Sequence, residues 1–279
     1  MIQIQDFSFT YKDEEHPALK EINLHVPEGG FLGIIGPAGA GKTTLARAVA
    51  GIIPHHYPGD FYGSITVNGL DTVDSPLVDL SRLVGTVFQD VESQIISPLV
   101  EDELLYGLEN FSVPREEIPD RMEDALRRVG IADLRERSIS SLSGGQRQKV
   151  AIASIIALKP KILLLDEPTG ELDPRSSRQV FSLLKELNEE QGITVIIIEQ
   201  KIMLLCEFAR QLAVLSGGRI VRQGDTRDVL AHSEELETLG VNCPRVTTLS
   251  RTLSAKTGEE QPVCINLDEA ENMVRRLIP

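Results

Sequence analysis

Residues 36–44 read GPAGAGKTT, and this stretch decides the fold. It fits the pattern G-x-x-x-x-G-K-[ST], with an apolar run at 31–35 before it and helical spacing at 43–49 after it. Glycines there let backbone N–H groups turn inward around phosphate oxygens, and the helix that follows presents its positive end. The stretch therefore predicts a nucleotide site between a strand and a helix, in preference to a glycine-rich turn that carries a lysine by chance.

Each part of this loop has an expected role in binding ATP and Mg²⁺. Lys42 supplies a positive charge to the β- and γ-phosphates, the Thr43 hydroxyl holds Mg²⁺, and Thr44 reaches the α-phosphate side. The backbone of the loop supplies the cradle around the phosphates, which is formed by Gly36, Pro37, Gly39, Ala40 and Gly41.

A pair of carboxylates supports the same interpretation. The apolar run 162–165 leads into Asp166 and Glu167, at the end of a predicted buried strand where ligands bind in open α/β sheets. One carboxylate there can hold a metal ion through water while the next polarises an attacking water. Taken alone the pair could be an ordinary strand end, but beside a phosphate loop the chemical interpretation is favoured.

The rest of the pattern predicts an α/β fold. Runs 162–165 and 194–198 are continuous in leucine and β-branched residues, which is typical of parallel strands covered on both faces. Asp173 and Pro174 open a helix that Gly192 closes, and residues 90–157 predict a mostly helical insertion. A first strand is predicted over 2–9, from Ile2, Ile4 and the run 7–9. Further strands are predicted at 22–26, 31–35, 63–67 and 83–88, with a hairpin of 213–215 and 220–221. Strands alternating with helices indicate a mostly parallel sheet, to which the first strands add an antiparallel part.

Composition excludes several classes of protein. The chain has 279 residues, of which 41% are hydrophobic and 25% charged, so wholesale disorder is excluded. Its net charge of −14 disfavours binding to nucleic acid, because such proteins carry a basic face. The longest apolar stretches fall far short of the roughly 20 residues that span a bilayer. No leader-like segment opens the chain, and we expect it in the cytosol.

A second glycine-rich helix start identifies the family that the sequence resembles. Residues 142–146 read LSGGQ, in which Ser143 is a good N-cap and Gly144 and Gly145 expose backbone donors, while Gln146 completes the motif. Nothing near it completes a second phosphate loop, as expected if it closes over a nucleotide held by another chain. Residues 1–225 resemble the ATPase domain of ABC transporters, and the motifs occur in that family's order.

The resemblance implies roles for further residues. Tyr11 stands where the family stacks an aromatic ring on adenine, with a plain surface aromatic as the alternative. Gln89 follows strand 83–88 like the glutamine that reaches the metal and the attacking water. Asp166 matches the metal-linked aspartate and Glu167 the general base, and the segment 172–173 matches the loop that crosses the dimer seam.

A narrower resemblance, in residues 92–118 and 239–253, is to the energy-coupling-factor importers of vitamins and metal ions. It implies a second ATPase subunit, a transmembrane coupling subunit and a substrate-binding membrane subunit, with this chain peripheral to the cytoplasmic face. It also implies that residues 226–279 are a C-terminal dimerisation segment, although apolar repeats there fit self-packing equally well. Glu101, Asp102 and Glu103 are expected to make the groove for a membrane subunit acidic, unless they are merely solvated.

One position departs from the family pattern. Alignment of the run 194–198 on the last strand places Gln200 where the family has a histidine that contacts the γ-phosphate and the attacking water. Glutamine donates a hydrogen bond but carries no positive charge at neutral pH. We therefore expect the site built on Lys42 to turn over slowly in a heterodimer, the alternative being that Gln200 is a functional substitute.

Two other functions fit the sequence less well. A soluble ABC-type ATPase of nucleic-acid repair or translation would bring coiled-coil arms, paired cassettes or a basic surface, and the sequence has none of them. A small-molecule kinase with the same phosphate loop would leave LSGGQ unexplained.

Overall fold

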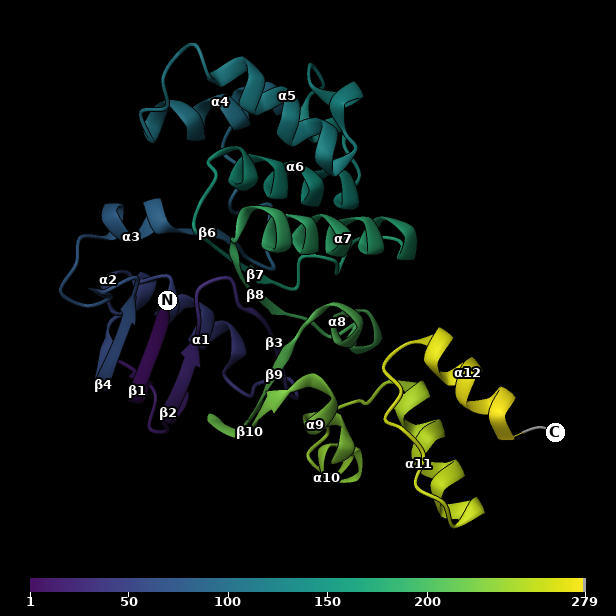
Figure 1. Ribbon diagram of the computed structural model, residues 1–279. Coiled ribbons are helices and arrows are strands. Elements are labelled where there is room, and N and C mark those ends of the chain that lie inside the picture. Colours follow the sequence, from purple (N-terminus) through teal and green to yellow (C-terminus); the bar gives the residue numbers. More distant parts are fainter. Residues whose placement is uncertain (278–279) are drawn as a thin grey trace.

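The computed structural model describes residues 1–277, which form two β-sheets covered by helices (Figure 1). The larger sheet has six strands in the order β10-β9-β3-β8-β7-β6. All its neighbouring pairs are parallel except β9 and β10, which form the predicted hairpin. These strands are β3 (Phe31–Ile35), β6 (Val84–Val87), β7 (Ile162–Asp166), β8 (Thr194–Ile198), β9 (Gln211–Ser216) and β10 (Arg219–Asp225).

The smaller sheet is antiparallel and has four strands in the order β2-β1-β4-β5. They are β1 (Ile2–Tyr11), β2 (Leu19–Val26), β4 (Gly59–Val67) and β5 (Leu70–Asp71). Buried residues alternate along β2, as expected for a strand with one face in the core. Together the two sheets confirm the predicted class, an α/β phosphate-loop core with a mostly parallel sheet and an antiparallel part.

The helices cluster by position in the chain. The predicted insertion contains α4 (Val100–Asn110), α5 (Ile118–Val129) and α6 (Gly144–Ala157), which lie on the side away from the antiparallel sheet (Figure 1). The core also has α1 (Lys42–Val49), α2 (Ile52–His55), α3 (Leu77–Leu83), α7 (Pro174–Gln191) and α8 (Ile202–Phe208). After residue 225 come α9 (Thr226–Ala231), α10 (Ser233–Thr238), α11 (Arg245–Thr257) and α12 (Leu267–Leu277).

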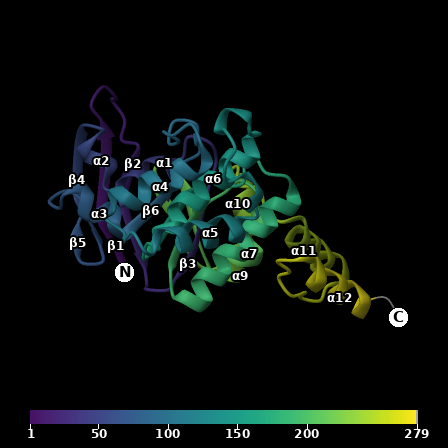
Figure 2. The same ribbon diagram turned by 90° about the horizontal axis from the view of Figure 1, so that it is seen from above.

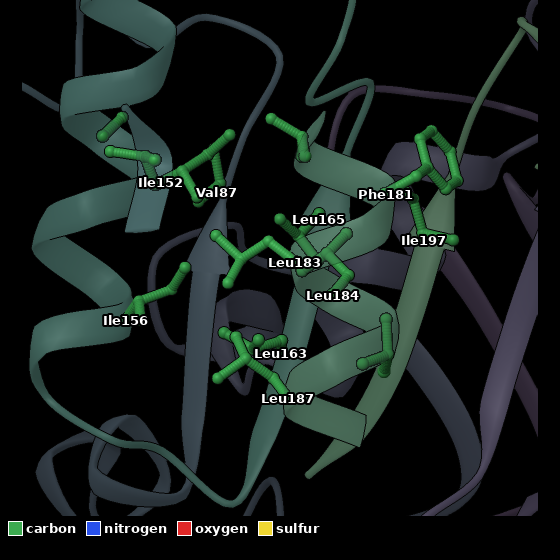
Figure 3. Packing of buried hydrophobic residues seen from close by; sticks show 14 of the residues in the cluster. Val87, Ile152, Ile156, Leu163, Leu165, Phe181, Leu183, Leu184, Leu187 and Ile197 are labelled. Carbon is green, nitrogen blue, oxygen red and sulfur yellow. The ribbon is translucent and has the colours of Figure 1, made fainter. Parts of the chain in front are cut away.

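Both faces of the parallel sheet are buried, because alternate residues of each strand point to opposite sides. On β7, Ile162 and Leu164 join a core shared with α1 and the antiparallel sheet. Leu163 and Leu165 join the core on the other side, where they lie against Leu183, Leu184 and Leu187 of α7 (Figure 3). This packing holds the carboxyl end of β7, and with it Asp166, in a fixed position.

The C-terminal region packs in two parts. Val229 and Leu230 of α9 and Leu236 of α10 belong to the main core. The last two helices have a small core of their own, centred on Val246, Cys264, Ala270 and Met273. They project from the body at the end opposite the antiparallel sheet (Figure 2). The packing boundary therefore falls at α11, later than the compositional change near residue 226.

Two local expectations need correction. The strand expected at 83–88 covers only 84–87, because residue 83 ends α3. The polar composition of residues 254–261 predicts a break in regular structure, but α11 continues to Thr257. There the Ser254 and Thr257 hydroxyls donate to the carbonyl oxygens of Ser250 and Leu253 at 3.0 and 2.9 Å, so polar side chains are accommodated within a helix.

Candidate active site

The phosphate loop is a cradle that only glycine can line at two positions. A Cβ on Gly36 would collide with the Leu215 carbonyl oxygen, and one on Gly41 would lie 2.6 Å from the Ala18 carbonyl oxygen. Gly41 also has a φ of +101°, which disfavours any side chain. It is the N-cap of α1, and no side chain caps the helix there. The first N–H groups of α1 are thus left for a ligand.

The Lys42 side chain is hydrogen-bonded to the backbone of this loop. Its Nζ donates hydrogen bonds of 2.9 Å to the carbonyl oxygens of Gly36 and Pro37. Burial lowers the pKa of Lys42 from its usual range, an effect that the nearby Glu167 and Asp166 carboxylates oppose. The ammonium group is therefore held at the loop, where an anion would restore its stability.

Thr43 and Asp166 form a pair of oxygen ligands beside the loop. The Thr43 Oγ1 donates to Asp166 Oδ2 at 2.6 Å. Asp166 is 1% exposed, and its pKa is raised mainly by burial and also by the Glu167 charge, against the effect of the Thr43 hydrogen bond. A buried carboxylate with a raised pKa is stabilised by a cation, so this pair suits a small, hard metal ion.

Glu167 lies between two glutamine amides. Gln89 Nε2 donates to its Oε2 at 3.2 Å, and Gln200 Nε2 donates to its Oε1 at 2.6 Å. The backbone of Glu167 has a φ of +52°, an uncommon conformation for a residue that is not glycine. The three residues predicted separately, from three different strand ends, are thus brought together around one carboxylate.

An aromatic cluster lies beside the first turn of α1. The Tyr11 hydroxyl is 3.1 Å from Thr44 Oγ1 and accepts a hydrogen bond of 3.5 Å from Arg47. Tyr57 meets the edge of Tyr11, with ring centroids 6.1 Å apart, and Arg47 lies 4.5 Å from the Tyr57 ring centre. Sequence reasoning found Tyr11 but missed Tyr57 and Arg47, because nothing in the spacing of 47 and 57 predicts that they meet.

The second glycine-rich helix start is built differently. Ser143 caps α6 by accepting the Gln146 backbone N–H at 3.3 Å, and the Gln146 side chain accepts the Ser143 N–H at 2.9 Å. Gly144 and Gly145 lie beside them, against Glu171. A cavity of about 420 Å³ opens at this point, lined by residues 143–146, 171–173 and a few neighbours. No residue of the phosphate loop lines it, among those the structure describes.

These residues fit ATP with Mg²⁺. The glycine cradle leaves room for phosphates where a Cβ would not, and Thr43 and Asp166 present hard oxygen ligands. Within residues 1–277 no group of three or more His, Cys, Asp or Glu side chains could hold a metal by itself. An ion that draws its remaining ligands from water and phosphate, as Mg²⁺ does, suits such a site.

The groove expected to be acidic is mostly apolar. A cavity of about 320 Å³ between α3, α4 and α6 is lined by Leu77, Tyr106, Ile155 and other apolar groups. Glu103 is buried there, and its carboxylate accepts the N–H groups of Ile96 and Ser97 at 3.0 and 2.9 Å, so it holds the preceding loop. Glu101 pairs instead with Arg135. Glu101 and Glu103 are thus engaged within the chain, which corrects the expectation that they make the groove acidic.

In the part of the chain that the structure describes, no helix combines the length and the apolar character needed to cross a membrane. The fold and the phosphate site together define a P-loop nucleoside-triphosphatase.

Comparison with known proteins identifies the family. The family model described as "ABC transporter" matches residues 19–170. A putative ABC transporter ATP-binding protein of Methanosarcina acetivorans is 42% identical over 92% of this chain, which spans only 40% of that longer relative. The energy-coupling factor transporter ATP-binding protein EcfA1 of Caldanaerobacter subterraneus subsp. tengcongensis is 40% identical over 91% of both chains.

A solved structure agrees with these relatives. The cbiO1 protein of Clostridium perfringens, described as part of the ABC transporter complex cbiONQ, superposes with a TM-score of 0.74. It is 32% identical and covers 89% of this chain and 97% of its own. The chain therefore belongs to the ABC transporter family, as one of its ATP-hydrolysing subunits.

Proposed function

We propose that this chain binds and hydrolyses MgATP as one half of a head-to-tail dimer, and that it thereby energises an energy-coupling-factor importer of a vitamin or a metal ion. The observation that carries the dimer is the separation of the two glycine-rich helix starts. The cavity at residues 143–146 has no contribution from the phosphate loop within the described residues. Two chains arranged head to tail would bring each phosphate loop to the other chain's LSGGQ.

The residues of the site suggest how hydrolysis proceeds. Bound Mg²⁺ supplies charge to the phosphates, and Thr43 and Asp166 would hold it. Lys42 neutralises charge on the transferring phosphoryl group, having exchanged its two backbone acceptors for phosphate oxygens. Glu167 orients the attacking water and accepts its proton, and the Gln89 and Gln200 amides hold that carboxylate in place. Tyr11 would stack on the base.

The membrane partner is proposed to dock in the groove between α3, α4 and α6. Its apolar lining and the exposed side chains of Ile96 and Tyr106, at 69% and 48%, favour an apolar helix face over a basic one. The relative named as an energy-coupling-factor subunit supports this transporter type for the present chain. We place the ATPase domain at 1–225, with its helical subdomain at about 90–157, and the dimerisation segment at 226–279, of which α9 and α10 pack on the main core.

Gln200 supports a heterodimer in which this chain's own site is the slower one. Its amide donates to Glu167 at 2.6 Å, so it acts on the base without adding positive charge near the γ-phosphate. In such a pair, Ser143 and Gly145 of this chain would complete the faster site of a related ATPase subunit.

A complementation experiment on the purified transporter tests the shared pocket. Lys42→Ala destroys the phosphate loop and Ser143→Arg blocks the LSGGQ half-site, so each variant alone is expected to be inactive if the chain forms a homodimer. If the chain pairs with itself, a mixture of the two regains roughly a quarter of the parent ATPase rate, because half of the dimers carry one intact pocket. If it pairs with a relative, Ser143→Arg abolishes the relative's turnover, whereas Lys42→Ala spares it. A monomer at full rate, indifferent to Ser143→Arg, would contradict the proposal.

A further inference from the structure

Three consecutive side chains after β8 all reach the connection between β7 and α7. Gln200 is the one expected from the sequence, and it donates to Glu167. Its neighbours make contacts that the sequence did not reveal. The Glu199 carboxylate accepts the hydroxyl of Thr169, and these side chains are only 4% and 0% exposed. A buried carboxylate is stable only with such a partner, so the contact is a fixed one.

Lys201 makes the larger set of contacts. Its Nζ donates to the carbonyl oxygens of Thr169 and Leu172, the second at 2.9 Å, and to Ser177 Oγ at 3.1 Å. An ammonium group has three protons, and here each has an acceptor. Charge-assisted hydrogen bonds are about twice as strong as neutral ones. Lys201 therefore clamps both ends of the loop 169–172 and the start of α7.

This loop connects the two nucleotide-binding features of the chain. At one end it follows Glu167, whose carbonyl oxygen accepts the Gly170 N–H at 3.2 Å. At the other end Glu171 lies against the second helix start, since a Cβ on Gly145 would be 3.1 Å from its carbonyl oxygen. Any displacement of the loop would thus change the positions of both Glu167 and the LSGGQ half-site.

We propose that Glu199 and Lys201 are positioning residues that latch the loop 169–173 to the end of β8, and so couple the state of this chain's ATP site to the geometry of its LSGGQ half-site. The predicted effect of the latch on turnover depends on the proposed function, whereas its effect on the position of the loop does not. Gln200 contacts Glu167 in the ATP site, while Glu199 and Lys201 contact the loop. A shift of the end of β8 would therefore move both.

Amide hydrogen exchange tests the latch in the full chain without nucleotide. Lys201→Met keeps the stem of the side chain and removes its three donors. Because the Leu172 N–H is bonded to the same Thr169 carbonyl oxygen, at 3.1 Å, we expect exchange across 169–173 to accelerate about tenfold or more. Lys201→Arg, which retains donors, restores most of the protection. Lys185→Met, at an exposed lysine of α7, serves as the matched control and changes nothing in this loop.

Steady-state kinetics of the assembled transporter tests the coupling. Lys201→Met is expected to lower kcat by about tenfold to a hundredfold, because small displacements of catalytic groups are costly, while KM for ATP stays within about twofold. Lys201→Arg recovers much of kcat. This separation of kcat from KM, with recovery by arginine, is not what general loss of folded protein would produce.

Two results would overturn the proposal: unchanged exchange in 169–173 for Lys201→Met, or faster exchange together with an unaltered kcat. Failure of the proposed function is distinguishable from both. It would show as an absence of ATPase activity in the parent complex, while the exchange difference between Lys201→Met and the parent remained and still supported the latch.

Discussion

The two glycine-rich helix starts of this chain look alike in sequence and differ in structure. At α1 no side chain caps the helix, and two glycines lie where any side chain would collide with backbone. At α6 the first N–H groups are partly used, because Ser143 and Gln146 cap each other. The first start is an open anion cradle, whereas the second is already stable without a ligand.

The two helix starts also differ in the charged side chains around them. The phosphate-loop site concentrates Lys42, Asp166 and Glu167 in a partly buried cluster, whose pKa shifts show that burial is costly for two of them. The half-site at Ser143 is exposed and needs no such cluster. The first start is therefore suited to hold phosphates, whereas the second keeps part of its N–H groups engaged within the chain, as the proposed dimer would allow.

The largest expected effect is at the carboxylate that distinguishes the first site. Glu167→Gln should lower kcat by about 10²–10⁴, since it removes the proposed general base, and should leave MgATP binding intact. ATPase rates and nucleotide-binding titrations measure the two quantities. Glu190→Gln, the same change at an exposed position of α7, is the control. Equal loss of binding and turnover would mean that Glu167 acts in binding the phosphates.

A gain of activity is expected at the same site from Gln200→His. A histidine there can donate a hydrogen bond and also carry positive charge near the γ-phosphate, which should raise kcat by up to about a hundredfold. The measurement compares ATPase rate and uptake in reconstituted vesicles with those of the parent. If neither quantity changes, the impaired-site hypothesis is wrong and Gln200 is a functional substitute.

In the isolated chain, the second helix start is expected to respond in stability. Ser143→Ala removes the N-cap of α6 and should lower the free energy of unfolding by about 1 kcal/mol, while Ser143→Thr, which keeps the hydroxyl, should lose much less. Urea unfolding of the isolated chain measures both. A loss as small for alanine as for threonine would show that the cap contributes little and that the two helix starts differ less than their contacts indicate.

The smallest effect concerns the buried charge of Asp166, and its sign depends on pH. Because the folded-state pKa of Asp166 is raised, the ionised side chain lowers stability at pH values above that pKa. Asp166→Asn should therefore stabilise the nucleotide-free chain at neutral pH, and this gain should vanish as the pH falls below the ordinary aspartate pKa of about 3.9. Urea unfolding at several pH values measures it, with the exposed Asp13→Asn as control. A gain that grows toward low pH would contradict this assignment.

Much of the architecture could be predicted from local patterns. The continuous apolar runs at 162–165 and 194–198 have no alternation, so only strands covered on both faces suit them. Asp173 caps α7, where the sequence predicted it, and Gly192 ends that helix in the left-handed conformation. Such signals lie within a few neighbouring residues, so they can be interpreted without knowledge of the fold. For Glu103 the predicted acidic groove and the solvated alternative are both wrong, because its carboxylate accepts the N–H groups of Ile96 and Ser97, a contact that no local pattern reveals.

The sequence by itself determined the phosphate loop, the strand that carries Asp166 and Glu167, and the second helix start, because each is encoded within a few neighbouring residues. Only the tertiary structure decided that Gln89 and Gln200 share one carboxylate, that Tyr57 joins Tyr11, and that Lys201 clamps a loop some thirty residues earlier. Those contacts arise where parallel strands end side by side, and the order of strands in a sheet follows from packing over the whole core, which no short stretch of sequence records.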